Sequence, residues 1–285
     1  MSDPVFFITG ASSGFGESIS LEARKRNFKV IATARRSAKI AHLKEAGAAV
    51  MDLDVTADEA TLAAKLEEAN SIYGKITHVI NAAGYVLEGA IEESSNNEIF
   101  DTFNTNVFGA VNITRAALPY LRAQQSSVLA HFGSLASWNG MPGVASYNAT
   151  KWAVSGLTES LAPELAPFGI RACVIEPGYF RTALLNSGGH RIHSARHIEA
   201  YDNTAARNIH GALNQADNKQ LGNVDAAARV IIDVFTGTGV GAGREIPVRL
   251  VLGSDILAGI KEKMADTDKL LNEWESVIIT TDHKD

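Results

Sequence analysis

The amino-acid sequence predicts an α/β protein built on a doubly wound parallel sheet. Short, continuous apolar runs recur along the chain, and longer segments with helical apolar spacing lie between them. Continuous apolar strands that alternate with amphipathic helices are typical of a parallel sheet covered by helices on both faces. Because crossovers between parallel strands are right-handed, such a sheet is wound outward in two directions.

The expected elements follow this alternation along the whole chain. Strands are expected at 5–9 (VFFIT), 29–33 (KVIAT), 49–53 (AVMDL), 77–81 (THVIN), 127–132 (SVLAHF), 171–176 (RACVIE) and 247–252 (PVRLVL). Helices are expected at 16–26, 59–69, 98–122 and 150–165, and the acidic C-terminal extension 254–285 has the pattern of an amphipathic helix. No linker, low-complexity tract or internal repeat interrupts them, so residues 1–285 are expected to form one domain.

Composition and charge narrow the range of partners. The chain has 285 residues, 46% of them hydrophobic, and its net charge of −6 argues against binding to nucleic acid or to anionic membranes. No stretch reaches the ~18–20 apolar residues of a membrane helix, and the N-terminus lacks the basic region of a signal peptide. Cys173 is the only cysteine, which excludes an intrachain disulfide. We therefore expect a cytoplasmic protein.

A glycine-rich turn, TGASSGFGESI, joins the first expected strand to the first expected helix. Gly10, Gly14 and Gly16 let the backbone approach a pyrophosphate closely, and the helix N-terminus beyond them supplies free N–H groups. The spacing is G-x-x-x-G-x-G, which differs from the G-x-G-x-x-G fingerprint. Its position directly after the first strand nevertheless predicts a nucleotide site of the Rossmann-like kind. The other turn residues expected to line this site are Ser12, Ser13 and Phe15.

The end of the second strand indicates which nucleotide binds. About 20 residues beyond the glycine turn, a carboxylate would bind the ribose 2′-hydroxyl of NAD. Here Ala34 is followed by Arg35 and Arg36, and two guanidinium groups can hold a 2′-phosphate through charge-assisted, bidentate bonds. We therefore expect NADP(H) in preference to NAD(H). The alternative for these arginines is a solvated basic loop, and NAD(H) stays open.

The stretch SYNATKWAV places Tyr147 and Lys151 four residues apart at the start of an expected helix. Residues with this spacing share one helical face, so the phenol and the ammonium can point into one site. Taken alone, the spacing favours a half-buried tyrosine beside a solvated lysine, because such pairs are frequent by chance. The remaining motifs decide between the two interpretations.

Taken together, the motifs make the sequence similar to the short-chain dehydrogenase/reductase family, of its single-domain type. The resemblance covers residues 5–182 in the family order and extends more loosely to 247–252. The matching motifs are TGASSGFG (9–16), LDV (53–55), NAAG (81–84), NTNVFG with Asn106, FGSLAS with Ser134, YNATK (147–151) and PGYFRT (177–182). Any one of these could be accidental, but all seven in order almost cannot.

This resemblance implies an NADP(H)-dependent ketone reductase or alcohol dehydrogenase, with hydride transferred from the pro-S face of the nicotinamide. The residues that match the catalytic four of the family are Ser134, Tyr147, Lys151 and Asn106. Those that match its cofactor contacts are Asp54, Val55, Asn81, Ala82, Gly84, Tyr147, Lys151, Pro177, Gly178 and Thr182. Two positions depart from the family pattern. Gly133 stands where a serine usually precedes the catalytic serine, and Ser13 stands where some NADP-using members have arginine or lysine.

The chemistry of these side chains agrees with the implied roles. Hydride addition to a carbonyl builds negative charge on oxygen, so a nearby proton donor lowers the barrier. A free tyrosine has a pKa near ~10, and we expect the ammonium of Lys151 to lower the pKa of Tyr147 and to bond the nicotinamide ribose. Ser134 is expected to hold the substrate oxygen, and Asn106 a water chain that resupplies the proton. The alternative for Ser134 is a turn serine at the end of a strand. The alternative for Asn106 is a buried amide that satisfies a helix kink.

The polar segment 183–222 lacks a sustained helical period, and in the family this region forms a mobile lid over the substrate. The resemblance therefore implies a helical lid inserted near the C-terminal part of the domain. The expected substrate contacts are Ser134, Trp138, Met141, Tyr147, Leu184, Leu185 and, within the lid, Tyr201. Trp138 at the pocket wall favours an apolar or aromatic substrate. The alternative for Trp138 is simple packing, and the alternative for the segment 183–222 is a plain surface loop.

Three histidines of this segment, His190, His193 and His197, share the spacing of one helical face and could bind zinc. No carboxylate or cysteine completes the set nearby, and hydride transfer needs no metal. We therefore expect no metal site.

Two other functions remain open at this stage. An epimerase or dehydratase shares the tyrosine–lysine pair, but such enzymes usually carry a different glycine turn and a longer C-terminal domain. A non-catalytic NADPH sensor commonly loses the tyrosine or the lysine, whereas all four catalytic positions are present here. In relatives, the helices at 98–122 and after Tyr147 form a dimerising surface, which implies a homodimer or a homotetramer.

Overall fold

The computed structural model describes residues 3–186 and 189–283, and a seven-stranded parallel sheet runs through its centre. The strands are β1 (Val5–Thr9), β2 (Lys29–Ala34), β3 (Ala49–Asp52), β4 (His78–Asn81), β6 (Ser127–Phe132), β7 (Ile170–Pro177) and β9 (Arg249–Leu252). They lie in the order β3-β2-β1-β4-β6-β7-β9, and each overlaps a strand predicted from the sequence. The order reverses direction between β1 and β4, which is where parallel sheets of this kind bind ligands.

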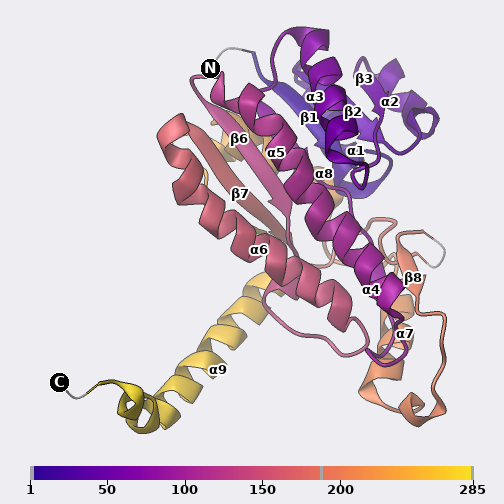
Figure 1. Ribbon diagram of the computed structural model, residues 1–285, viewed down its shortest axis with the longest axis vertical. Coiled ribbons are helices and arrows are strands. Elements are labelled where there is room, and N and C mark those ends of the chain that lie inside the picture. The colour runs from indigo at the N-terminus through magenta and orange to yellow at the C-terminus, as the bar shows by residue number, and fades with distance from the viewer. Residues whose placement is uncertain (1–2, 187–188, 284–285) are drawn as a thin grey trace.

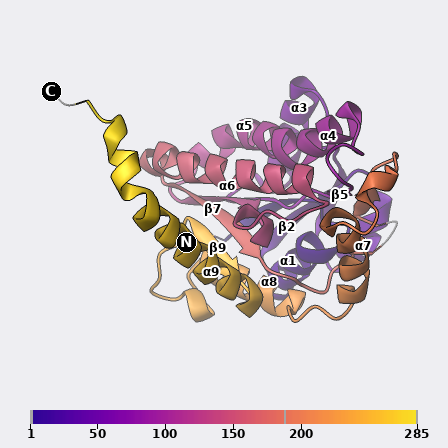
Figure 2. The same cartoon turned by 90° about the horizontal axis from the view of Figure 1, so that it is seen from below.

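Helices cover both faces of the sheet (Figures 1 and 2). On one face lie α3 (Glu59–Tyr73), α5 (Gly109–Arg122) and α6 (Ala145–Leu165), and on the other lie α1 (Gly14–Lys25) and α8 (Val224–Thr236). The remaining helices near the sheet are α2 (Ala41–Glu45) and α4 (Asn96–Phe103). The doubly wound α/β fold predicted from the sequence is therefore confirmed.

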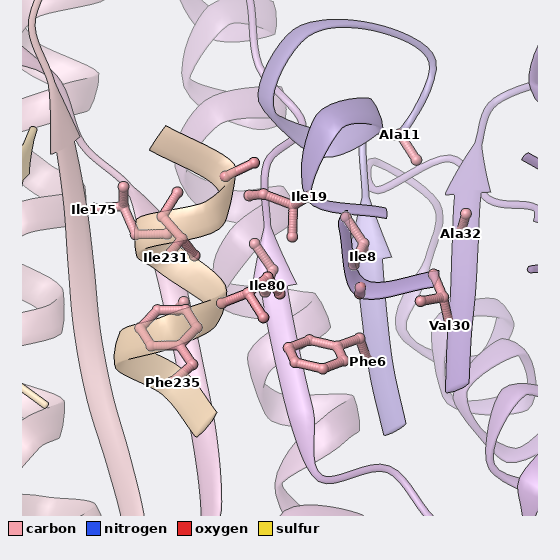
Figure 3. Close-up of a cluster of buried hydrophobic side chains, with 14 of the residues drawn as sticks. Phe6, Ile8, Ala11, Ile19, Val30, Ala32, Ile80, Ile175, Ile231 and Phe235 are labelled. Atoms are coloured by element: carbon pink, nitrogen blue, oxygen red, sulfur yellow. The ribbon is translucent and has the colours of Figure 1, made fainter. Parts of the chain in front are cut away.

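The core consists of two apolar layers, one on each face of the sheet. Phe6 and Ile8 of β1 are fully buried and pack in one cluster with Ile231 and Phe235 of α8 (Figure 3). Phe7, between them, points to the opposite layer. Both faces of the strand are thus buried, which explains why its sequence is continuously apolar instead of alternating. Each such side chain contributes about 1.5–3 kcal/mol of transfer free energy.

Two buried histidines make the fold sensitive to acid. His78 bonds to Thr77 and to the carbonyl of Phe235, and His131 lies between two threonine hydroxyls. Burial lowers the pKa of each imidazole to about 4. In the unfolded chain the histidine pKa is about 6.5, so between these values only the unfolded state takes up the proton. Their contribution to stability is complete above pH 6.5 and is lost as the pH falls toward 4.

We expect the free energy of unfolding to fall by roughly 2 kcal/mol per buried histidine between pH 7.5 and pH 5. Urea unfolding at the two pH values measures this change. The variant His131→Gln carries no titratable group at that position and should lose its share of the pH dependence. Equal stability of the wild-type protein at both pH values would contradict the prediction.

Outside the main sheet, the segment 183–222 forms a small substructure beside the carboxyl ends of the strands. Its strand β8 (Arg191–His193) pairs in parallel with β5 (Val86–Glu88), and its helix α7 (Ala205–Ala216) follows. The helical insertion expected here is observed as α7, although the segment has no sustained helical period along its whole length. The chain then reaches α9 (Ser254–Ile278), which projects from the body (Figures 1 and 2). Among the described residues, no helix combines the length and apolar character needed to cross a membrane.

Candidate active site

A cleft of about 520 Å³ opens at the carboxyl end of the sheet, at the switch point between β1 and β4. All the predicted catalytic, cofactor and substrate residues line it except five, which are Arg36, Asn81, Asn106, Trp138 and Tyr201. The glycine turn, the tyrosine–lysine pair and the lid residues are therefore brought together in one site. The lid residue Tyr201 lies outside the cleft and donates its hydroxyl hydrogen to Glu92.

The glycine turn is packed too closely to accept side chains. Gly10 has φ +65°, and a Cβ on it would lie 2.7 Å from the backbone of Ala83. A Cβ on Gly16 would lie 2.5 Å from the carbonyl oxygen of Gly10. Ser13, the N-cap of α1, does not cap the helix with its side chain. The turn therefore leaves backbone N–H groups at a helix N-terminus without a side-chain cap, which suits the pyrophosphate of a dinucleotide.

Tyr147 and Lys151 are both buried on α6 at the floor of the cleft. The Nζ atom of Lys151 lies 5.7 Å from the centroid of the Tyr147 ring and donates to the carbonyl of Phe132 at 2.7 Å. An ammonium has three N–H donors, so this bond fixes its position and leaves two for other partners. The bond also ties α6 to the end of β6.

Burial sets the protonation of this pair. It raises the pKa of Tyr147 to about 12, against the opposing effect of the neighbouring Ser134 hydroxyl. It also lowers the pKa of Lys151 to about 8. The expectation that Lys151 lowers the pKa of Tyr147 is therefore wrong for the chain by itself, because the cost of burying a phenolate is the larger effect. Tyr147 carries its proton at neutral pH.

Ser134 lies just after the end of β6 and lines the cleft. Its Oγ accepts from the backbone N–H of Ala136 at 3.1 Å, so it caps the short turn that follows. A hydroxyl has two lone pairs and one O–H, and its O–H stays available to a second oxygen. The turn-serine interpretation and the catalytic one are thus compatible.

Gly133 is one of the two departures from the family pattern, and the structure explains why a glycine stands there. A Cβ at this position would lie 2.9 Å from the Cγ of Glu176, a fully buried residue of β7. The carboxylate of Glu176 accepts from Ser155 Oγ at 2.8 Å, from Arg249 at 2.6 Å and from Trp138 Nε1 at 2.9 Å. A glycine before Ser134 makes room for this buried ion pair behind the catalytic turn.

The same cluster corrects the prediction for Trp138. Its indole N–H is bonded to Glu176, and the guanidinium of Arg249 lies 4.6 Å from its ring centroid. The side chain is therefore held in the ion-pair cluster and does not line the cleft. Of the two interpretations that the sequence allowed, packing is the one that the structure supports.

Asn106 lies in a π-helical turn, residues 104–108, that joins α4 to α5. Its Oδ1 accepts from the N–H of Tyr85 at 3.0 Å, and its Nδ2 donates to the carbonyl of Tyr85 at 2.9 Å and to Thr150 Oγ1 at 3.2 Å. The amide thus clamps the backbone beside Gly84 and does not reach the cleft wall. Single π-helical turns are frequent at functional sites, and the role of Asn106 in a water chain stays a prediction.

Two residues that were predicted to bind the cofactor, Arg36 and Asn81, do not line the cleft. Arg36 is exposed at the start of the short helical turn 37–40. Asn81 is buried at the end of β4, and neither atom of its amide has a partner among the described residues. Such an amide directly behind the cofactor cleft is unusual, because buried polar groups are normally bonded.

The sequence missed several residues of the wall. Those on the substrate side are Val86, Val144, Tyr179, Ile192, Ile209 and Leu213. The spacing of Ile209 and Leu213 is that of one helical face, and this was the signal available in the sequence. Together with Met141, Leu184 and Leu185 they make this part of the cleft apolar.

His190 was considered only as a metal ligand, but it lines the cleft beside the glycine turn. Its Nε2 lies 2.8 Å from Ser13 Oγ, and its carbonyl accepts from the N–H of Val86 at 2.8 Å. Burial is the main effect that lowers the pKa of His190, and the charges of Arg35 and Lys39 lower it further.

The three histidines proposed as a zinc set have different partners. His190 contacts Ser13, His197 lies 3.3 Å from Asp202, and His193 lies 3.6 Å from the buried carboxylate of Glu88. His210 of α7 joins Glu88 at 2.8 Å, so that one carboxylate and two imidazoles converge. The buried guanidinium of Arg191 lies 3.4 Å from the other oxygen of Glu88. Glu88 of β5 thus contacts residues of β8 and α7, and it is a carboxylate that the sequence did not place beside these histidines.

Comparisons with known proteins agree with this geometry. Residues 4–192 match the family model for short chain dehydrogenases. Oxidoreductase BOA17 of Botryotinia fuckeliana is 32% identical over 88% of this chain and 89% of its own length. A short-chain dehydrogenase from Streptomyces avermitilis has the same fold over 99% of this chain and all of its own, with 34% identity and a TM-score of 0.87. The 3-ketoacyl-(acyl-carrier-protein) reductase from Brucella melitensis, solved with NADH, aligns over 88% of this chain and 97% of its own at 26% identity and a TM-score of 0.71.

The fold and the comparisons together define an α/β oxidoreductase. The chain belongs to the short-chain dehydrogenase family.

Proposed function

We propose that this chain is an NADP(H)-dependent oxidoreductase that interconverts a ketone or aldehyde and the corresponding alcohol, with Tyr147 as the general acid and base. The observation that carries the proposal is the convergence of Ser134, Tyr147 and Lys151 on the wall of the cleft that also holds the glycine turn. A nicotinamide cofactor held there by the glycine turn, Lys151 and Thr182 would supply the hydride.

Ser134, Tyr147 and Lys151 each have a part in the proposed reduction. Ser134 donates its free O–H to the substrate oxygen and holds it near the phenol. Tyr147, which burial keeps protonated at neutral pH, gives its proton to that oxygen as negative charge develops on it. Lys151, positioned by the carbonyl of Phe132, offers its remaining N–H donors to the cofactor ribose and its charge to the phenolate that forms. In the direction of alcohol oxidation the proton moves the opposite way.

The substrate is proposed to be a small carbonyl compound with an apolar body. The support is the set of aliphatic side chains that α7, the 184–185 turn and Val144 present to the cleft. The displacement of Trp138 from the wall removes the argument for an aromatic ring in particular. A homodimer or homotetramer and a cytoplasmic location remain part of the proposal, on the strength of the resemblance and the composition.

The experiment for this proposal is oxidation of NADPH and of NADH by the purified protein, across a panel of aliphatic, cyclic and aromatic ketones. We expect turnover with NADPH, and higher rates with apolar ketones than with charged ones. Tight binding of NADPH without turnover of any carbonyl would count against a reductase and in favour of a cofactor sensor.

The preference for NADP(H) is proposed to rest on Arg35 together with His190. Arg35 lines the cleft at the end of β2, and His190 reaches Ser13 from the lid. Ser13 holds the position where some NADP-using relatives have a basic residue, so an imidazole from another segment would supply the missing donor. A 2′-phosphate placed between these groups would favour the protonated imidazole.

We expect Arg35→Gln and His190→Gln each to lower kcat/KM for NADPH by about 10- to 100-fold, because each removes a hydrogen bond to a charged group. The kcat/KM values for NADH should change by less than about twofold, since NADH lacks the 2′-phosphate. Arg36→Gln is the matched control, and its exposed side chain should have little effect on either cofactor. An equal loss with both cofactors would show that the two residues act on the fold or on catalysis instead.

A further inference from the structure

The C-terminal helix α9 leaves the body of the protein soon after it begins. Ile256 is fully buried and Ile260 is 9% exposed, and these two residues anchor its first turns. Every described residue from 261 to 283 is exposed. Figures 1 and 2 show the helix standing away from the sheet and its covering helices in both views. The projecting part is therefore a helical arm, residues 261–278, without contact to its own body.

This arm carries a stripe of large apolar side chains. Those exposed on it are Met264 (62%), Leu270 (56%), Leu271 (53%), Trp274 (54%), Val277 (52%) and Ile278 (47%). Isolated helices of this length are marginal in water, and monomeric proteins rarely expose a contiguous apolar patch. An arm of this kind indicates a binding surface whose partner is absent from the single chain.

The spacing of the stripe indicates what kind of partner fits. Met264, Leu271 and Ile278 follow one another at intervals of seven residues, and Thr267 and Trp274 repeat the interval three positions later. These are the a and d positions of a heptad repeat, which pairs with a helix of the same period. Leu270 and Val277 take the g positions beside this seam, so the apolar stripe is wider than the a and d positions alone.

The charged residues lie where such a pairing needs them. Lys269 and Glu273 pair along the helix at 3.9 Å, at outer positions of the heptad. Lys263 and Asp268, five residues apart, flank the seam as g and e positions. A parallel copy of the same helix would place Lys263 opposite the Asp268 of its mate. The seam is thus complementary to itself in charge as well as in period.

We propose that the arms of two copies of this chain pair with each other through the seam 264–278 as a short parallel coiled coil. The other long helices of the described chain already use their apolar faces on the sheet, which leaves the arm of a second copy as the matching partner. The pairing goes beyond the proposed reductase activity and does not depend on it, because the arm contributes no residue to the cleft.

A single engineered cysteine tests the pairing. The only native cysteine, Cys173, is fully buried, and burial raises the pKa of its thiol to about 12, so it does not compete. Leu271 is an a position at the middle of the seam 264–278, and like a positions face each other in a parallel pair, so Leu271→Cys faces its own counterpart. The matched control is Asn272→Cys, one residue away on the outer face.

We expect mild oxidation of the full-length protein at micromolar concentration to join Leu271→Cys into a disulfide-linked dimer, while Asn272→Cys remains monomeric on a non-reducing gel. Sedimentation should show that Leu271→Asp raises the dissociation constant of arm pairing by about 100-fold or more, with ketone reduction or cofactor binding unchanged. Failure of Leu271→Cys to cross-link, or cross-linking of both variants at the same rate, would overturn the proposal. In particular, an arm that docks on the body of a partner would keep the two thiols apart.

Discussion

Tyr147→Phe should lower kcat for ketone reduction by about 10²- to 10⁴-fold, the range that a positioned proton donor supplies. The variant removes the phenol hydroxyl that we propose as the proton donor, and it keeps the ring that packs with Val86, Ala136 and Val144. Because burial holds the pKa of Tyr147 at about 12, the wild-type side chain is protonated throughout the neutral range. Stopped-flow or steady-state oxidation of NADPH measures the loss.

The control for this prediction is cofactor binding, followed by NADPH fluorescence. The glycine turn and Lys151 are intact in Tyr147→Phe, so the dissociation constant of NADPH should change by less than about threefold. A variant that retains most of its kcat would show that another group, such as water, gives the proton. A variant that no longer binds NADPH would show that the ring helps to shape the cofactor site.

Arg249→Met should destabilise the protein by about 3–5 kcal/mol, because it leaves the buried carboxylate of Glu176 without its cation. Glu176 is fully buried, and its other donors, Ser155 and Trp138, are neutral. Arg249 also covers the ring of Trp138. Urea unfolding at pH 7.5 measures the change, and kcat should fall as well if the cluster supports the turn that carries Ser134.

Two controls separate the buried pair from general surface effects. Glu159→Gln removes the more exposed partner of Arg249 and should cost no more than about 1 kcal/mol. The double variant Glu176→Gln with Arg249→Met has no uncompensated charge, so it should be more stable than Arg249→Met alone. A loss below about 1 kcal/mol in Arg249→Met would show that the ion pair between Arg249 and Glu176 contributes little to stability.

The fold was predictable because its signal is repeated in every element. Each predicted strand overlaps an observed one, since a strand buried on both faces must be apolar throughout, as VFFIT is. The helix expected at 98–122 is interrupted by the π-helical turn at 104–108. That interruption depends on how Asn106 bonds to Tyr85 across the fold, and no local pattern in the sequence reports such a contact.

The residues of the site also divide into those that a local pattern in the sequence reveals and those that depend on contacts across the fold. The glycine turn, Tyr147 and Lys151 were predictable because their spacing along one turn or one helix already fixes their geometry. Trp138 and His190 were not, because a buried carboxylate from β7 holds the first and the lid brings the second to Ser13. The pKa of Tyr147 was predicted with the wrong sign, since the sequence shows the neighbouring lysine but not the depth of burial.

The most direct measurement is the transfer of deuterium from NADPH labelled at the pro-S position of C4 to the product alcohol, followed by mass spectrometry. With the wild-type protein and a ketone from the panel, we expect one deuterium on the carbinol carbon for each NADPH consumed. With Tyr147→Phe, which should still bind NADPH, we expect almost no labelled alcohol in the same time. Binding of NADPH without label in any product would contradict the proposal that this cleft reduces carbonyl compounds.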